Sequence, residues 1–355
     1  MTALATPGEV RAARVHPGWV AAGFAALGVA LVAGITIGAV GLRPGGVVLE
    51  LVGRLPGVDV DSGLDARQAA IVWDLRLPRV VLALLVGAML ASAGASYQGV
   101  FRNPLADPYL LGAAAGAGLG ATLAIAGRSS FSVGLLDPAP LAAFAGALVA
   151  VFLSYTIASV GRGMDRSPAI LLLAGVAVAA FLTALQTFVA QRNADSLREV
   201  YIWLLGRLST TGWSEVVAVL PYFVLTTVVL VLSRRTLDVL STGDDEAATL
   251  GIDVGRVRLL VVAAASLSTA AAVSVSGLIG FVGIVVPHTV RLLAGTSYRV
   301  IVPLSLLFGG AFLAGADLLA RTALSPAEVP IGVVTAVFGA PFFALVLRTR
   351  RRLTA

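Results

Sequence analysis

Ten long apolar stretches constrain the fold of this sequence more than any other feature. A helix that crosses a bilayer needs about 20 consecutive apolar residues, and stretches near that length recur along the chain, bounded by arginine, proline or acidic residues. They cover residues 19–40, 80–100, 109–127, 139–160, 169–190, 213–232, 257–275, 278–295, 300–320 and 331–347. Only 12% of the residues are charged, against roughly 25% in a soluble domain. We therefore expect an all-α polytopic membrane protein with ten transmembrane helices.

The spans define the expected domains and topology. A tail over residues 1–18 precedes a ten-helix domain over residues 19–348, and residues 349–355 form a second tail. An even number of spans places both termini on one side of the membrane. With cytoplasmic termini, 15 of the 25 arginines lie inside and the other 10 outside, the direction that the positive-inside rule favours. The expected protein is a multi-pass protein of the plasma (inner) membrane with both termini cytoplasmic.

Missing residue types exclude several kinds of chemistry. All 25 basic residues are arginine, and the chain has no cysteine. Without lysine there is no P-loop for ATP and no lysine Schiff base, and without cysteine there is no disulfide or thiolate site. The two histidines, His16 and His288, lie too far apart in sequence to indicate a zinc site. We expect no cofactor or metal in this chain, and we assign its net charge of +6 to arginines at the membrane faces rather than to a nucleic-acid partner.

Few charged residues fall at membrane depth, which bears on the class of transporter. Asp317 and Arg291 are the clearest cases. Ion-coupled secondary transporters usually carry ionisable residues near the membrane centre, so their scarcity weighs against an ATP-independent secondary transporter, the alternative function. A membrane scaffold is a third possibility. No Ser/His/Asp set or carboxylate pair lies within the spans, which weighs against an enzyme.

Glycine and proline patterns mark two spans. In the third, Gly112, Gly116 and Gly120 make one stripe of small residues on a helix, which fits either bundle packing or a sliding surface. In the eighth, Pro287 removes one backbone hydrogen bond and frees the carbonyl of Gly283. A kinked or broken helix is therefore expected there, lining a pathway or a seam between subunits.

The loop at residues 234–256 is the longest on the expected cytoplasmic side and is too polar to span a membrane. Ser241 or Thr242 is suited to cap a short helix, and Gly251 is placed to end it. The first turn would carry three acids, which favour a helix N-terminus: Asp244, Asp245 and Glu246. This surface helix is either a docking element or a solvated loop helix.

Several long segments resemble one family. They are RLPRVVLALLVGAMLASAGASYQGVFRNPLADPYLLGAAAGAG, GDDEAATLG, SGLIGFVGIVVPHTVRLLAG and ADLLARTALSPAEVPIGVVTAVFGAPFFALVL. In this order they resemble the permease subunits of ATP-binding-cassette (ABC) importers for iron-siderophores, haem and cobalamin, and the resemblance extends from residue 19 over nearly the whole chain.

The resemblance implies an assembly. It consists of a homodimer of ten-span subunits in membrane lipid with a central translocation path, two cytoplasmic ATPase subunits that bind ATP and Mg²⁺, and an extracytoplasmic substrate-binding protein. The segment that couples to the ATPase would comprise Gly243, Asp244, Glu246, Ala247, Leu250 and Gly251. The gate and path would involve Ser167, Pro168, Gly283 and Pro287. The cargo stays open, with an iron-siderophore or haem first and cobalamin second.

The resemblance also implies a role for three outer arginines. Arg76, Arg79 and Arg321 match family positions that pair with glutamates of the binding protein, and arginine suits bidentate pairing with a carboxylate. Reversal of Arg76 and Arg79 to glutamate is then expected to abolish transport while the dimer stays folded.

Two connecting segments carry further expectations. The turn at residues 103–108 cannot be helical throughout, because two prolines interrupt it; we expect it to support the ATPase contact. Residues 192–213 combine tyrosine and tryptophan with polar residues, which indicates a short helix at the outer surface. That helix would either lie at the mouth of the path or anchor the chain at the interface.

Overall fold

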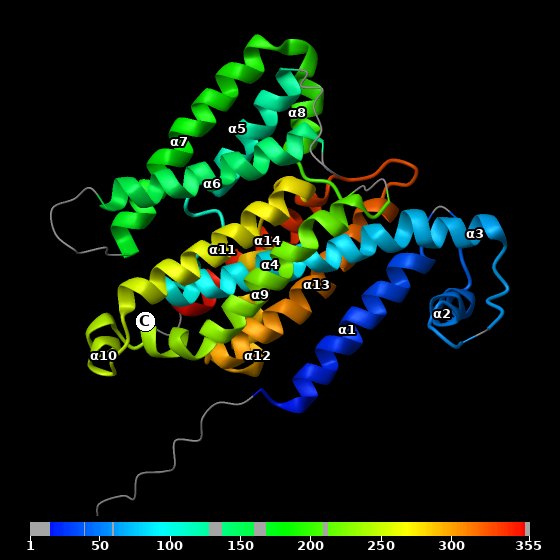
Figure 1. Ribbon diagram of the computed structural model, residues 1–355, viewed down its shortest axis with the longest axis horizontal. Helices are drawn as coiled ribbons and strands as arrows, with labels where there is room; N and C mark the ends of the chain where they lie inside the picture. The colour runs from blue at the N-terminus through cyan, green and yellow to red at the C-terminus, as the bar shows by residue number, and fades with distance from the viewer. Residues whose placement is uncertain are drawn as a thin grey trace, which may run out of the picture.

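The computed structural model describes residues 15–38, 40–58, 60–127, 137–159, 168–208 and 212–351, and this part of the chain contains helices and no strand (Figure 1). The elements are α1 (Pro17–Thr36), α2 (Pro44–Gly53), α3 (Ala66–Ala70), the π-helix η1 (Ile71–Arg76), α4 (Leu77–Val100), α5 (Ala113–Ala126), α6 (Pro138–Ser159), α7 (Pro168–Arg192), the 3₁₀ turn η2 (Ala194–Ser196), α8 (Leu197–Leu204), α9 (Ser214–Leu240), α10 (Asp244–Thr249), α11 (Val254–Ser276), α12 (Val282–Ala294), α13 (Tyr298–Thr322) and α14 (Ile331–Arg351).

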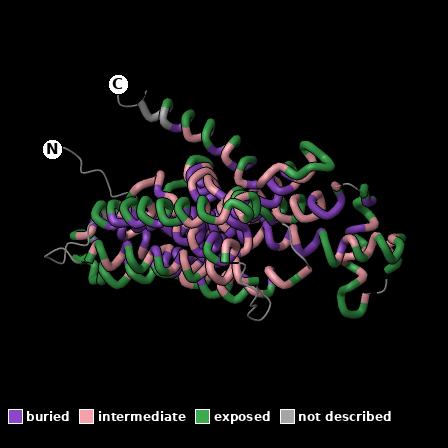
Figure 2. The backbone as a smooth tube through the Cα atoms, turned by 90° about the horizontal axis from the view of Figure 1, so that it is seen from above, coloured by how far each residue is buried: buried purple, intermediate pink, exposed green. Residues whose placement is uncertain are grey.

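Helix α4 lies at the centre of the bundle. It packs against α1, α9, α11, α12 and α13, and 83% of the apolar window in its segment is buried, against 17% for α1 and 28% for each of α6, α7 and α9. The outer helices therefore keep one apolar face exposed (Figure 2). Such faces are stable in hydrocarbon and not in water, so the burial pattern fits a protein surrounded by lipid.

Seven helical segments among the described residues are long and apolar enough to cross a membrane. This confirms the polytopic all-α class. Each of the ten predicted spans coincides with a helix, but those in the third and eighth spans have only 14 and 13 residues. The count of ten crossings and the homodimer stay predictions.

Several span boundaries differ from the sequence prediction for physical reasons. The third span becomes helical only at Ala113, because the proline-containing segment before it forms turns, as expected, and Gly112 adopts a left-handed φ of 80°. The eighth begins at Val282 rather than at residue 278. Helix α9 continues to Leu240, so the predicted loop at residues 234–256 starts inside a helix and the connection to α10 is short.

Small residues set the contact between α5 and α6. A Cβ atom on Gly116 would lie 2.1 Å from the carbonyl oxygen of Gly146, and one on Gly120 would lie 2.0 Å from that of Ala142. The two backbones therefore touch at Gly116 and Gly120, whereas Gly112 precedes α5 and faces α7. These contacts favour the bundle-packing interpretation of the glycines over a sliding surface.

The bundle has two ends that matter for function. Helices α2 and α3 lie at one end and α10 lies at the other (Figure 1). Central helix α4 joins them: it begins next to η1 at the α2 end, and the turn that follows it contacts α10. Its 24 residues rise about 36 Å, enough to cross the hydrocarbon layer.

Candidate functional site

Arg79 is the centre of an ion-pair cluster at the α2 end. Its Nη2 lies 2.8 Å from Oδ1 of Asp317, and its Nε lies 3.1 Å from both Asp317 oxygens. On its other side, Nη1 and Nη2 each donate to one carboxylate oxygen of Glu328 at 2.9 Å. The Asp317 side chain is only 2% exposed, whereas that of Glu328 is 51% exposed. One buried and one exposed carboxylate therefore hold the same guanidinium.

Arg76 and Arg321 close the C-terminal end of α1. The carbonyl groups of a last helical turn lack partners within their own helix, and cations are favourable there. Arg321 donates from Nη2 to the carbonyl of Gly34 and forms an ion pair with Asp317. Arg76, which is 8% exposed, donates to three carbonyl oxygens at 2.5 to 3.2 Å, those of Ile35, Thr36 and Val40.

The structure thus brings the three predicted docking arginines together, and all three are engaged within the chain. Reversal of Arg76 to glutamate would place a carboxylate against the carbonyl oxygens that Arg76 now serves, so we expect this reversal to lower stability as well as transport. The expectation that the double reversal leaves the dimer folded stays a prediction. The docking role of the trio stays a prediction. Asp317 and Glu328 were not expected from the sequence in this cluster, because they pair with Arg79 across more than 230 residues.

Glu328 provides a pH-dependent test of the cluster. The hydrogen bonds from Arg79 hold the pKa of Glu328 below its usual range, so the pair stabilises the fold at neutral pH and is lost as the pH falls through the lowered pKa. We expect the melting-temperature difference between wild type and Glu328→Gln to be fully present at pH 7 and to shrink only as the pH falls below about 4.3, the pKa of a glutamate in the unfolded chain. The exposed Asp74 provides a control variant, Asp74→Asn. A difference that grows on acidification would contradict the pairing.

The predicted coupling segment forms α10, as expected, but its cap differs. The hydroxyls of Ser241 and Thr242 donate to the carbonyls of Asp238 and Val239 in α9, so neither residue caps α10, and Gly243 occupies the cap position with a φ of 149°. The expectation of a serine or threonine cap is therefore wrong. Gly251 follows the helix with a φ of 79°, in the conformation that commonly ends helices.

Charged contacts attach α10 to the rest of the bundle. Asp244 accepts from Arg258 of α11 at 2.8 Å and lies 3.4 Å from Arg102, in the turn after α4. Ala247 is completely buried, whereas Leu250 is 69% exposed. The helix is therefore fixed on its inner side and presents an apolar residue outward, which favours a docking element over a solvated loop helix.

The connection between α11 and α12 is the broken segment that Pro287 suggested, but the break lies at residues 277–281. Gly277 and Phe281 have φ values of 67° and 68°. The Tyr109 hydroxyl donates to the carbonyl of Ile279 at 3.0 Å and accepts from the Ile279 amide at 3.2 Å. Tyr109 comes from the turn before α5, so one side chain satisfies both backbone groups of a non-helical residue, as an apolar environment requires.

Gly283 was predicted to have a free carbonyl, and the structure shows its partner. The Gln98 side chain, 0% exposed, donates to that carbonyl at 3.2 Å. Gln98 in turn accepts from Arg291 at 3.4 Å, and Arg291 also donates to the Tyr298 hydroxyl at 3.1 Å. Gln98 and Tyr109 could not be singled out from the sequence, because their partners lie on distant segments.

Other predicted path residues are placed as follows. Ser167 lies outside the described residues, and Pro168 is the first residue of α7, a position that proline favours. The gating role of Ser167 and Pro168 stays a prediction.

The outer segment at residues 192–213 contains a short helix, α8, as expected. In it Tyr201 is 61% exposed and Trp203 is buried.

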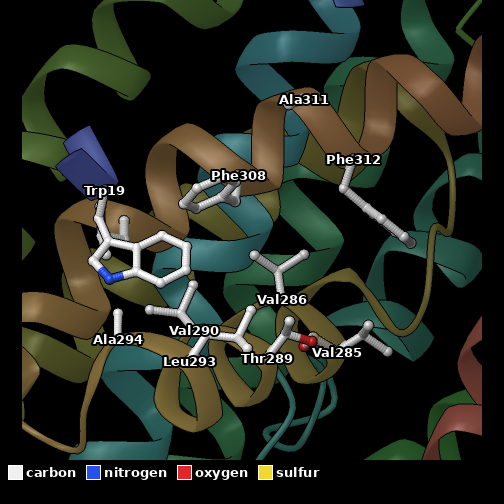
Figure 3. Close-up of a pocket in the computed structure, with 11 residues that line it drawn as sticks. Trp19, Val285, Val286, Thr289, Val290, Leu293, Ala294, Phe308, Ala311 and Phe312 are labelled. Atoms are coloured by element: carbon white, nitrogen blue, oxygen red, sulfur yellow. Dashed lines mark hydrogen bonds between the residues drawn. The ribbon is translucent and has the colours of Figure 1, made fainter. Parts of the chain in front are cut away.

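An apolar cavity of about 280 Å³ lies between α1, α12 and α13 (Figure 3). Trp19, Val290 and Phe308 are among the side chains around it, and Thr289 contributes its one hydroxyl. That hydroxyl donates to the Val285 carbonyl. No charged side chain is among the residues that line the cavity, so it offers a charged cargo no ionic partner.

The helical fold agrees with comparisons to known proteins. The sequence matches the FecCD transport family over residues 26–349. The chain belongs to this family. It is 46% identical to the cobalamin import system permease protein of Halobacterium salinarum over 288 aligned residues. The alignment covers 81% of this chain and 76% of that protein. It is 39% identical over 285 residues to the hemin transport system permease protein of Yersinia pestis, covering 79% and 84%.

A solved structure supports the same assignment. The inward-facing conformation of a metal-chelate type ABC transporter matches with a TM-score of 0.81 at 28% identity, covering 94% of this chain and all of that chain. The resemblance to permease subunits of ABC importers is therefore confirmed. The family works with ATPase subunits and substrate-binding proteins, and its members are permeases rather than enzymes.

Proposed function

We propose that this chain forms a homodimeric, ten-span permease that imports an iron chelate or cobalamin. The first candidate cargo is an iron-siderophore or haem, and the second is cobalamin. ATP and Mg²⁺ are bound by two cytoplasmic ATPases, and this chain holds no cofactor. An extracytoplasmic binding protein docks at the arginine cluster, where Arg79 pairs with it and Arg76 and Arg321 support the surface. Both termini are cytoplasmic.

The observation that carries the proposal is that the arginine cluster and the surface helix α10 lie at opposite ends of the central helix α4. The arginine cluster lies at the start of α4, and the turn after α4 contacts Asp244 of α10. The broken segment that Tyr109 and Gln98 hold lies in the helices around α4. Asp317 and Arg291, the charges expected at membrane depth, are both engaged by other side chains, which favours an ATP-driven machine over an ion-coupled one.

The exposed Leu250 tests the ATPase contact. In Leu250→Asp, a charge replaces an apolar residue that is 69% exposed, so folding is unaffected while docking to an apolar ATPase pocket is lost. Removal of such a contact reduces affinity on the order of tenfold or more. We expect binding-protein-stimulated ATP hydrolysis by the reconstituted complex to fall by a similar factor. Leu55→Asp, at a 55% exposed position in the α2-end segment, is the matched control and leaves hydrolysis unchanged.

Reconstitution tests the function as a whole. The permease, its ATPase and its binding protein in proteoliposomes should show vanadate-sensitive hydrolysis that the binding protein stimulates. Uptake driven by a proton gradient without stimulation would overturn the proposal. Titration of the purified binding protein with haem, ferric siderophores and cobalamin then identifies the cargo. Cobalamin is included because one relative of this chain is a cobalamin import permease.

A further inference from the structure

We infer that Glu328 occupies the place on Arg79 that a carboxylate of the binding protein takes when it docks, so that docking exchanges an internal carboxylate for an external one. This inference rests on the docking role proposed for Arg79. It assigns to Glu328 control over the affinity of the partner, a role distinct from that of the three arginines.

The donor count of Arg79 requires an exchange. A guanidinium has five N–H groups, and the bonds to Asp317 and Glu328 use Nε, both N–H groups of Nη2 and one of Nη1. A single N–H on Nη1 is left. Bidentate pairing with a third carboxylate needs two parallel N–H groups, so one of the two resident carboxylates must leave.

Burial decides which carboxylate leaves. Asp317 is 2% exposed and is also paired with Arg321, so its removal from Arg79 would leave a buried charge with less compensation. Glu328 is 51% exposed, and water can solvate it once it swings away. Glu328 is therefore the displaceable partner.

The surroundings let the exchange occur by side-chain rotation. The neighbouring Val329 donates its amide to the Ala320 carbonyl at 2.8 Å, which anchors the backbone beside Glu328. A cavity of about 330 Å³ borders Arg79, Asp317 and Glu328 and provides room for an incoming side chain. Arg207 lines the same cavity and makes no ion pair with any described residue, so a second cation faces the space that a carboxylate would enter.

Glu328→Gln tests the exchange, because it removes the competing charge and keeps the size of the side chain. We expect the cargo-free binding protein to bind the nanodisc-embedded permease–ATPase complex about fivefold more tightly at low salt, the effect of one exposed ion pair. Glu328→Ala should act in the same direction. Asp74→Asn is the matched control, since it removes an exposed acid from η1 without contacting Arg79, and it leaves affinity unchanged.

A double-mutant cycle separates this inference from the docking proposal. Arg79→Gln should weaken binding, and adding Glu328→Gln to it should give no tightening, because the two carboxylates no longer compete. If Arg79→Gln weakens binding but Glu328→Gln does not tighten it, or if Asp74→Asn tightens it equally, the exchange is overturned and docking at Arg79 stands. If Arg79→Gln has no effect, docking at Arg79 fails and the exchange fails with it.

Discussion

Gly94→Ala should prevent the permease from assembling its core, although it adds only one methyl group. A Cβ atom at Gly94 of α4 would lie 2.0 Å from the carbonyl oxygen of Gly283 and 2.6 Å from its Cα. These are backbone atoms of α12 and cannot rotate away. Overpacking usually costs about 1–3 kcal/mol, and a clash between two backbones lies at or above the upper end because whole helices must separate. Separation would also break the hydrogen bond from Gln98 to Gly283.

Thermal unfolding and size-exclusion profiles of the purified protein measure the effect. Gly28→Ala in α1 and Gly315→Ala in α13 are matched controls, since an alanine Cβ at either position would meet no neighbouring atom of the described residues within 4 Å. Both should be neutral or stabilising, because alanine favours helices by about 1 kcal/mol over glycine. The close approach of α4 and α12 would be refuted by a Gly94→Ala protein as stable as the two controls.

Asp317→Ala should produce the second large loss. The Asp317 side chain is 2% exposed and lies between Arg79, at 2.8 Å, and Arg321, at 3.6 Å. Its removal leaves two largely buried guanidinium groups without their shared counter-charge. Breaking a buried ion pair from one side costs about 3–5 kcal/mol, so a marked drop in melting temperature and in yield is expected.

A second variant keeps this prediction informative. The double variant Asp317→Leu with Arg79→Leu removes both partners of the buried pair. It should recover part of the stability that Asp317→Ala loses, because no unpaired charge remains at position 79. Glu328→Gln, which breaks only the exposed half of the cluster, should cost about 1 kcal/mol or less. Equal melting temperatures for Asp317→Ala and Glu328→Gln would show that burial does not determine the strength of these pairs.

Much of the fold was predictable from hydropathy, because apolar length reflects the thickness of the bilayer. The positions of the ten predicted helices followed from it. The surface helix α10 was predicted instead from its acidic first turn and from Gly251, and the turn at residues 103–108 from its two prolines. The helix ends were less predictable. The extension of α9 to Leu240 carries two arginines past the apolar stretch. Its buried residues Leu237 and Leu240 lie among polar ones, so this extension has no continuous apolar stretch that would predict it.

Site residues were predictable only where the neighbouring sequence indicates their role. Pro287 pointed to the free carbonyl of Gly283 through a rule of helix geometry, but nothing local pointed to Gln98 as its partner. The arginine trio was expected to be available for docking, because the resemblance to the importer family implied that role. Arg76 is instead buried, since the carbonyls it satisfies belong to α1, about 40 residues earlier in the chain.

The capping of α1 by Arg76 and Arg321 affects how genetic data on this protein should be interpreted. A screen for transport-deficient variants will recover both positions, and the simplest explanation would be a lost contact with the binding protein. Because both side chains also hold the end of the first helix, a loss of transport there equally reports on insertion and folding. Surface abundance therefore has to be measured for each such variant, and for Arg79 variants as well, because Arg79 pairs with the buried Asp317. Substitutions at the half-exposed Glu328 are the ones from which docking can be judged separately from assembly.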